Sequence, residues 1–172
     1  MATPASPRRP RRPAPFRLTT NEGWYYSPHM REWNPANGLD ENVKAMFTRG
    51  HCHVYAIALS ERTGWPVVIL SDGPPTESVR RATVGNGAWI HAVCRTPTGA
   101  LVDITGECGE HGYATLRPVS GAYLRRVVNS ARAGFGFGHG VAPADVGPGG
   151  NLTCARKAVD IALSTGVYRD AY

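Results

Sequence analysis

The sequence predicts one α+β domain in which an apolar helix packs on a small antiparallel sheet. Three observations support this fold class. Apolar residues recur at helical spacing after Gly50, and the continuous apolar run 66–70 has the length of a buried strand. Two further strand-like segments, 89–95 and 100–105, flank a short turn. A chain of 172 residues is long enough to bury one sizeable core.

The first twenty residues are expected to form a disordered arm, with the domain at 21–172. They contain five prolines and five arginines and bury too little apolar surface to offset the entropy of ordering. Those five arginines, of 19 Lys and Arg, leave 14 basic side chains against 13 acidic ones in the domain. The arm is a candidate contact for an acidic partner or nucleic acid, although its composition also suits a solvated tail.

Aromatic residues follow the arm. Trp24-Tyr25-Tyr26 and Trp33 are interrupted by Ser27-Pro28, and the sequence 34–38 is again rich in turn residues. Such turns exclude a long helix or strand. Because aromatic rings bring the largest hydrophobic contribution per residue, we expect most of them in the core. The wall of a substrate groove is the alternative.

Two helices are predicted next. The first spans 39–48, is capped by Asp40 or Asn37, and turns three apolar residues inward: Val43, Met46 and Phe47. The second begins near Cys52 and ends at Thr63-Gly64. The free N–H groups and dipole of a helix N-terminus stabilise an anion, so a thiolate is favoured there. Cys52 is therefore the predicted nucleophile.

A hairpin is predicted to place His91 and Asp103 on one face of the sheet. Pro97-Thr98-Gly99 has the sequence of a three-residue loop with glycine in the left-handed position. With that loop, Asp103 stands opposite Val93 and His91 is one diagonal step away. If the loop is 96–98 instead, His91 faces Asp103 directly. In both registers the Cβ atoms lie within about 8 Å of each other.

The remaining chain supplies loops and packing. We expect loops at 76–87 and 106–112, a helix at 119–131 and a last helix at 151–165 in which Cys154 packs. The glycine-rich segment 134–140 has no preceding strand and no closing Gly-Lys-Ser/Thr, which argues against a nucleotide loop.

Reduced thiols are the expected state of all four cysteines. They lie far apart, without a Cys-x-x-Cys pair, at Cys52, Cys94, Cys108 and Cys154. A domain of this size needs no disulfide for stability. The sequence has no apolar run of about 18 residues for a membrane span, and no apolar segment of a secretory signal follows the N-terminal arginines. We therefore expect a cytoplasmic protein without a membrane span.

Cys52, His91 and Asp103 are the residue types that thiol chemistry on an amide requires. The histidine takes the thiol proton and later protonates the leaving amine, while the carboxylate orients the imidazole. The N–H of Cys52 is a candidate for one arm of an oxyanion hole. For the second arm, Asn42, Asn86 and a backbone amide between residues 24 and 38 stay open. His51 and His53 flank the nucleophile, and His53 is expected to face solvent.

These residues resemble the core of the papain-like and transglutaminase-like cysteine enzymes. The resemblance covers 47–106 and rests on four segments: Gly50-His51-Cys52 with its alanine-rich helix, Thr63-Gly64-Trp65-Pro66, His91-Ala92-Val93, and residues 101–106. It implies a helix on an antiparallel sheet, a triad of Cys52, His91 and Asp103 and a type of reaction, but no particular substrate. We expect a protein or peptide substrate and no cofactor. The upstream glutamine of papain-like peptidases and the tryptophan that follows the transglutaminase histidine are absent. Acyl transfer to water, by a peptidase, isopeptidase, amidase or deamidase, and to an amine, by a transglutaminase, both stay open.

Two functions of another class also stay open. A zinc-binding module would draw its ligands from His51, Cys52, His53, His91, Cys94, Cys108 and His111, of which Cys108-x-x-His111 has ligand-like spacing. No two ligand pairs have the spacing of a zinc finger. A catalytically inactive papain-like domain would bind an acidic partner through its arm. Metal analysis distinguishes the zinc-binding module from an enzyme. Labelling of Cys52 distinguishes the inactive domain from an enzyme.

Overall fold

A computed structural model describes residues 16–21, 28–48, 51–71, 91–108, 117–118, 129 and 151–171. Several predictions lie outside these residues: most of the arm, Trp24 to Tyr26, Asn86, the loop at 76–87, His111, all of the helix at 119–131 except Asn129, and the segment 134–140. None of the described helices has the length and apolarity to cross a membrane.

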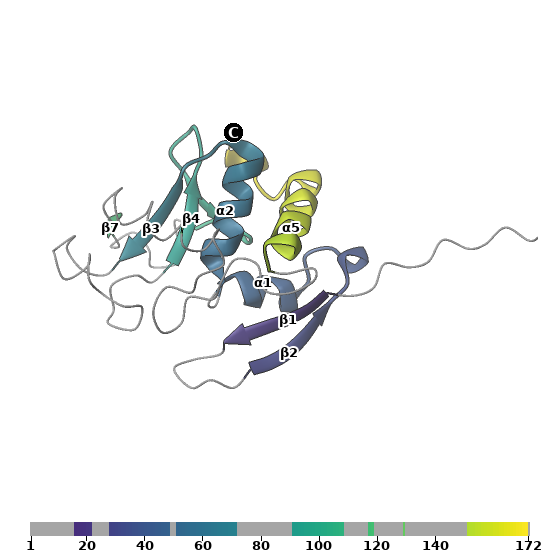
Figure 1. The fold of residues 1–172 in the computed structure, drawn as a ribbon. Helices are drawn as coiled ribbons and strands as arrows, with labels where there is room; N and C mark the ends of the chain where they lie inside the picture. Colours follow the sequence, from purple (N-terminus) through teal and green to yellow (C-terminus); the bar gives the residue numbers. More distant parts are fainter. Residues whose placement is uncertain are drawn as a thin grey trace, which may run out of the picture.

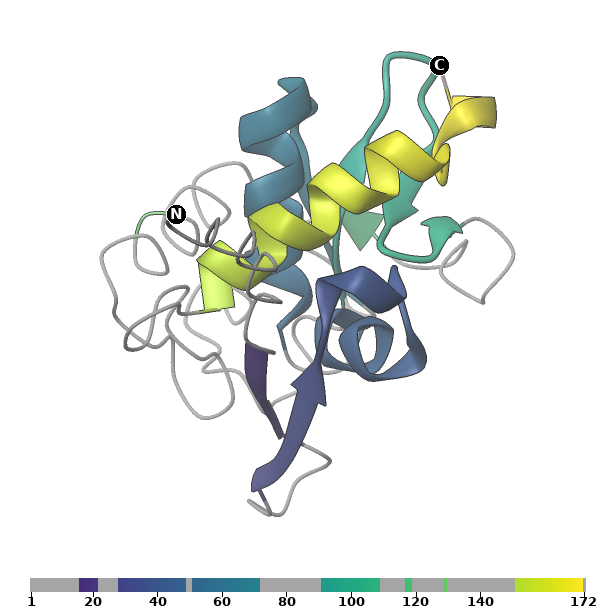
Figure 2. The ribbon, with the colours of Figure 1, turned by 90° about the vertical axis from the view of Figure 1, so that its right-hand side faces the viewer.

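The described part of the chain combines helices with an antiparallel sheet, as predicted. The sheet has five strands in the order β6 (Gly106–Glu107), β5 (Leu101–Asp103), β4 (His91–Arg95), β3 (Val67–Ser71) and β7 (Arg117–Pro118). Three α-helices are described: α1 (Glu41–Thr48), α2 (Cys52–Thr63) and α5 (Asn151–Thr165). In Figures 1 and 2, α2 lies between the sheet and α5, and it contacts both.

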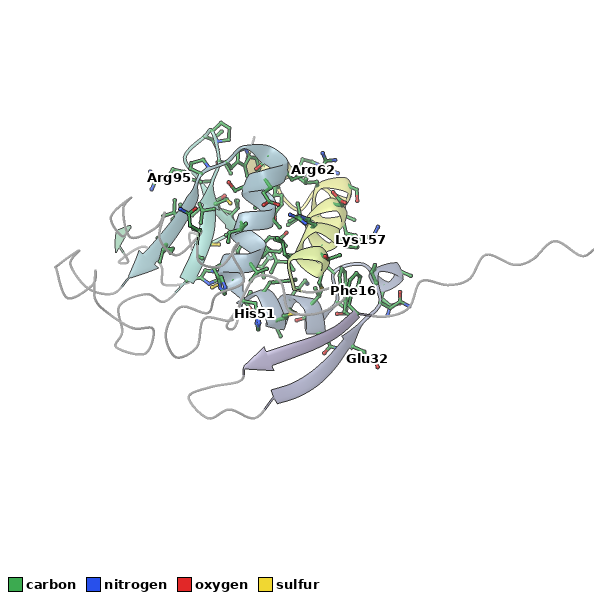
Figure 3. All side chains as sticks on the ribbon, viewed as in Figure 1. Phe16, Glu32, His51, Arg62, Arg95 and Lys157 are labelled. Atoms are coloured by element: carbon green, nitrogen blue, oxygen red, sulfur yellow. The ribbon has the colours of Figure 1, made fainter. Side chains whose placement is uncertain are left out.

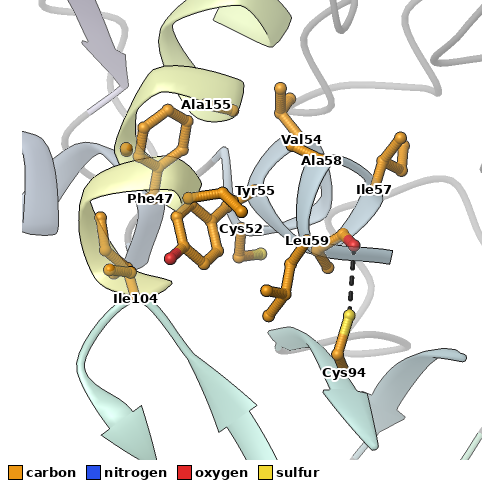
Figure 4. Packing of buried hydrophobic residues seen from close by; sticks show 14 of the residues in the cluster. Phe47, Cys52, Val54, Tyr55, Ile57, Ala58, Leu59, Cys94, Ile104 and Ala155 are labelled. Carbon is orange, nitrogen blue, oxygen red and sulfur yellow. Dashed lines mark hydrogen bonds between the residues drawn. The ribbon is translucent and has the colours of Figure 1, made fainter. Parts of the chain in front are cut away.

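Helix α2 is the centre of the core because it is covered from two sides. Its residues from Cys52 to Leu59 are all buried. A helix that packs on one side only would bury a single apolar stripe and expose the other residues. The thiol of Cys94 on β4 donates to the carbonyl of Ala56 at 3.2 Å, drawn as the dashed line in Figure 4. The Tyr55 hydroxyl forms a buried 2.6 Å hydrogen bond with the hydroxyl of Tyr168, beyond α5. These bonds join α2 to the elements on its two sides.

The loop at 97–99 fixes the predicted hairpin register. Cys94 pairs with Val102 and Arg95 with Leu101, the register in which Asp103 stands opposite Val93. The Thr96 N–H donates to the Ala100 carbonyl at 2.9 Å, and Gly99 has the left-handed φ of 93° that the loop requires. Of the two predicted registers, the first is confirmed.

The third predicted strand is shorter than the expected 100–105. It ends at Asp103, and Gly106 pairs back with Asp103 to start β6, where a loop at 106–112 was predicted. The carboxylate Oδ1 of Asp103 accepts the Thr105 N–H at 2.7 Å, which stabilises a tight turn. Gly106 completes the turn with a φ of 110°, a value that favours glycine.

The ends of the helices match the predictions closely. Asp40 caps α1, since its Oδ1 accepts the N–H groups of Asn42 at 3.0 Å and Val43 at 3.1 Å. Helix α2 ends at Gly64, which has a left-handed φ of 76°. Helix α5 occupies the predicted range 151–165, and Cys154 is buried in it.

The expected arm is shorter than twenty residues. Phe16–Asn21 forms strand β1, which pairs antiparallel with β2 (Pro28–Trp33) in a separate two-stranded sheet below α1 in Figure 1. The Phe16 ring stacks on Trp33 at 5.5 Å between centroids, and Trp33 is fully buried. This contact anchors the strand, and it confirms the core role predicted for Trp33.

Candidate active site

Cys52 is the first residue of α2, as the sequence predicts. His51 is the N-cap residue, and no side chain caps the helix. The His51 carbonyl accepts the N–H groups of Val54 and Tyr55, whereas no acceptor for the Cys52 N–H is found among the described residues. Figure 3 places His51 at the end of α2 next to α1, with Arg62 at the far end. The positive end of the helix dipole therefore lies at Cys52.

His91 and Asp103 meet between neighbouring strands. His91 Nε2 lies 2.8 Å from Asp103 Oδ2, and the two residues are only 1% and 6% exposed. The other carboxylate oxygen, Oδ1, accepts both the backbone N–H and the hydroxyl of Thr105, at 2.7 and 2.6 Å. Both oxygens of Asp103 are thus held in place, which in turn fixes the imidazole.

Thr105 is a site residue that our sequence analysis missed. The signal was present, because Asp-x-Thr is a spacing at which a carboxylate bonds backbone and hydroxyl two residues on. The turn then directs the second oxygen of Asp103 to His91. Without the hairpin register, that signal could not be linked to the site.

The electrostatics of the pair favour an imidazolium beside a carboxylate. Burial alone lowers the pKa of His91, but hydrogen bonds with Asp103, Cys108 and Cys52 outweigh it and raise the pKa. Burial likewise raises the pKa of Asp103, while the hydrogen bonds from His91 and Thr105 hold it below its usual value. Each group therefore supports the charged form of the other.

Cys52 is the one described thiol whose pKa is lowered. Burial raises it, but hydrogen bonding and electrostatic interaction with His53 and His91 lower it from 9.0 to about 6. Burial raises the pKa of Cys94 and of Cys154, each to about 12. All four cysteines are free, as expected. At neutral pH this arrangement favours a thiolate at Cys52 beside a protonated His91.

The two flanking histidines differ from expectation. His53 is 1% exposed, where a solvent-facing side chain was expected, because α2 is covered on both sides. It also lowers the pKa of the neighbouring Cys52 thiol. His51 is 2% exposed, and burial together with the charge of His53 lowers its pKa to about 4. His51 is therefore neutral at physiological pH.

The proposed zinc ligands are only partly brought together. Of the predicted ligands, His91 and Cys108 come together. One ligand atom of each lies within 4.8 Å of the other and of a carboxylate oxygen of Asp103, which was not among the predicted ligands. Cys94 is engaged with Ala56 instead, and His111 lies outside the described residues. His91 Nε2 and both oxygens of Asp103 already form short hydrogen bonds. This favours a hydrogen-bonded cluster over one that binds a metal ion.

Asn42 lies elsewhere in the fold. Its Nδ2 donates to the Glu32 carbonyl at 3.3 Å, which places the side chain at β2. The structure therefore does not favour Asn42 as the second oxyanion donor.

Comparison with protein-family models, with curated proteins and with solved structures found no match.

Proposed function

We propose that this protein is a thiol-dependent acyl-transfer enzyme acting on an amide or peptide bond. Cys52 is the nucleophile, His91 the proton carrier and Asp103 the residue that orients His91. The observation that carries this proposal is the buried 2.8 Å hydrogen bond between His91 and Asp103, beside a Cys52 thiol that starts a helix and whose pKa His91 lowers. Activated thiols of cysteine enzymes occupy such an environment.

The reaction follows from the charges of the two partners. The Cys52 thiolate attacks the carbonyl carbon, and the electron pair of the C=O bond moves to oxygen, where the Cys52 N–H can donate to it. Protonated His91 gives its proton to the amine as the C–N bond breaks, which leaves a thioester on Cys52. Neutral His91 then takes a proton from water or an amine, whose attack on the thioester releases Cys52 as thiolate.

The finer assignments belong to this proposal as well. A helix that starts with the nucleophile and packs on β4 is the arrangement expected of a papain-like or transglutaminase-like core. Four free thiols suit a reducing compartment such as the cytoplasm. A protein or peptide is the proposed acyl donor, and the basic residues near the N-terminus are a proposed contact for an acidic partner or nucleic acid.

A small activated ester tests the thioester step without knowledge of the natural substrate. The full chain is mixed with p-nitrophenyl acetate, and intact mass and peptide mapping follow the acetyl group. We expect one acetyl on Cys52 in the wild type, and none in Cys52→Ala. Adding a primary amine separates the two outcomes of the second step, because a transferase gives N-acetyl amine and a hydrolase gives acetate. Acetylation spread evenly over lysines and all thiols would overturn the proposal.

A further inference from the structure

We infer that Cys108 is a positioning residue that acts through His91, and that its uncharged thiol holds the protonated imidazole beside Asp103. This inference rests on the proposed function, because it concerns the proton carrier of that site. Cys108 is a buried thiol that the mechanism above does not use, yet it lies against two members of the triad.

The backbone fixes the position of the sulfur. Cys108 directly follows β6, and its N–H donates to the Leu101 carbonyl at 2.7 Å. The Sγ atom donates to the Gly106 carbonyl at 3.7 Å, a weak bond that leaves its lone pairs for another partner. The same sulfur lies within 4.8 Å of the ligand atoms of His91 and Asp103, and the residue is 1% exposed. The thiol therefore stands beside the pair and excludes water from it.

The groups around His91 show what the sulfur contributes. Asp103 approaches from β5, Cys108 from the end of β6, and Cys52 from α2, where His53 also contacts Cys52. On β3 the paired residue is the apolar Leu70. Among these described neighbours, Cys108 is the one polar partner of His91 that carries no charge in the active state.

The charge state of Cys108 follows from its surroundings. Burial raises the pKa of its thiol, and the charge of Asp103 raises it further, against the opposing effect of His91. A neutral sulfur within 4.8 Å of the ligand atom of His91 presents its lone pairs to the imidazolium, and this interaction raises the pKa of His91. Two thiols thus contact one imidazole in opposite states, Cys52 as thiolate and Cys108 as thiol.

A positioning role has a consequence that simple packing lacks. Cys108 contacts protonated His91 both before and after Cys52 loses its proton. Its removal should therefore lower the pKa of His91 and leave the pKa of Cys52 almost unchanged. Loss of a packing contact alone would reduce stability and shift neither titration selectively.

The test compares Cys108→Ala and Cys108→Ser with Cys154→Ala in the full chain. Cys154 is the matched control, a buried cysteine whose pKa is raised by burial alone. The His91 titration is followed by NMR of the imidazole carbons, and the Cys52 titration by its alkylation rate. In Cys108→Ala we expect the His91 midpoint to fall by about one pH unit or more, while Cys52 still titrates near 6. Cys108→Ser should restore part of the shift, and Cys154→Ala should cause none.

Two results would overturn the inference. One is an unchanged His91 midpoint in folded Cys108→Ala. The other needs no variant: in the wild type, a Cys108 Cβ resonance that does not change as His91 loses its proton would show that the two groups are not in contact. If Cys52 is labelled selectively in either case, the proposed function stands and the inference alone fails. If wild-type Cys52 reacts no faster than the other thiols, the proposed function fails first.

Discussion

His91 and Asp103 are joined by a 2.8 Å hydrogen bond between adjacent strands, and both side chains are almost entirely withdrawn from solvent. Solvent screens such a pair poorly, so each charge depends strongly on the other. The bond fixes the imidazole of His91, the proposed proton carrier, and it is a direct result of the hairpin register set at residues 97–99.

Asp103→Asn should retain the shape of the site and lose most of the activity. An amide cannot stabilise the imidazolium, and it presents His91 with a different tautomer preference. We expect the rate of thioester formation to fall at least about 100-fold, with a measurable residue, and the pKa of His91 to fall with it. Thioester formation at the wild-type rate in this variant would remove Asp103 from the mechanism.

Thr105→Val should loosen the carboxylate that orients His91. The variant loses the 2.6 Å hydroxyl bond to Asp103 Oδ1 while keeping a similar volume. We expect a loss of about 1–3 kcal/mol in the free energy of unfolding, together with slower thioester formation. Thr105→Ser should recover both, since it keeps the hydroxyl. Thr165→Val is the control, because that hydroxyl bonds backbone carbonyls within α5.

Tyr168→Phe should reduce stability without changing the chemistry. It leaves the buried hydroxyl of Tyr55 without its 2.6 Å partner, at a cost of about 1–3 kcal/mol in urea unfolding. The double variant with Tyr55→Phe removes both hydroxyls, so its loss should be smaller than the sum of the two single losses. Strictly additive losses would mean that the two hydroxyls contribute independently.

Chelators should leave the site intact. EDTA or 1,10-phenanthroline should change neither the melting temperature nor the alkylation rate of Cys52, because His91 and Asp103 already satisfy each other. A zinc-binding module would behave in the opposite way, since loss of a structural metal removes folding free energy. One equivalent of zinc in the purified protein, with a lower melting temperature after chelation, would favour the zinc-binding alternative.

The parts of the fold that local sequence determines could be predicted. Pro97-Thr98-Gly99 sets the hairpin register, Asp40 caps α1 and Gly64 ends α2. Each depends on a few neighbouring residues and a known turn or cap geometry.

The parts of the fold that depend on contacts between distant segments could not be predicted from the sequence. His53 is buried because α2 is covered by the sheet on one side and by α5, about a hundred residues further along the chain, on the other. Cys108 reaches His91 because β6 turns back onto β5, where the sequence alone predicted a loop. Strand β1 is anchored by the contact of Phe16 with Trp33 across its hairpin.

The most direct measurement is the alkylation rate of each cysteine against pH, by brief substoichiometric iodoacetamide and peptide mapping, in the wild type and in His91→Ala. The folded protein lowers the pKa of Cys52 from 9.0 to about 6, so its thiolate is populated above pH 6 and lost as the pH falls through that value. We predict that Cys52 reacts first, with a midpoint near pH 6 that moves to alkaline pH in His91→Ala. Equal and slow labelling of all four cysteines in both proteins would contradict the account.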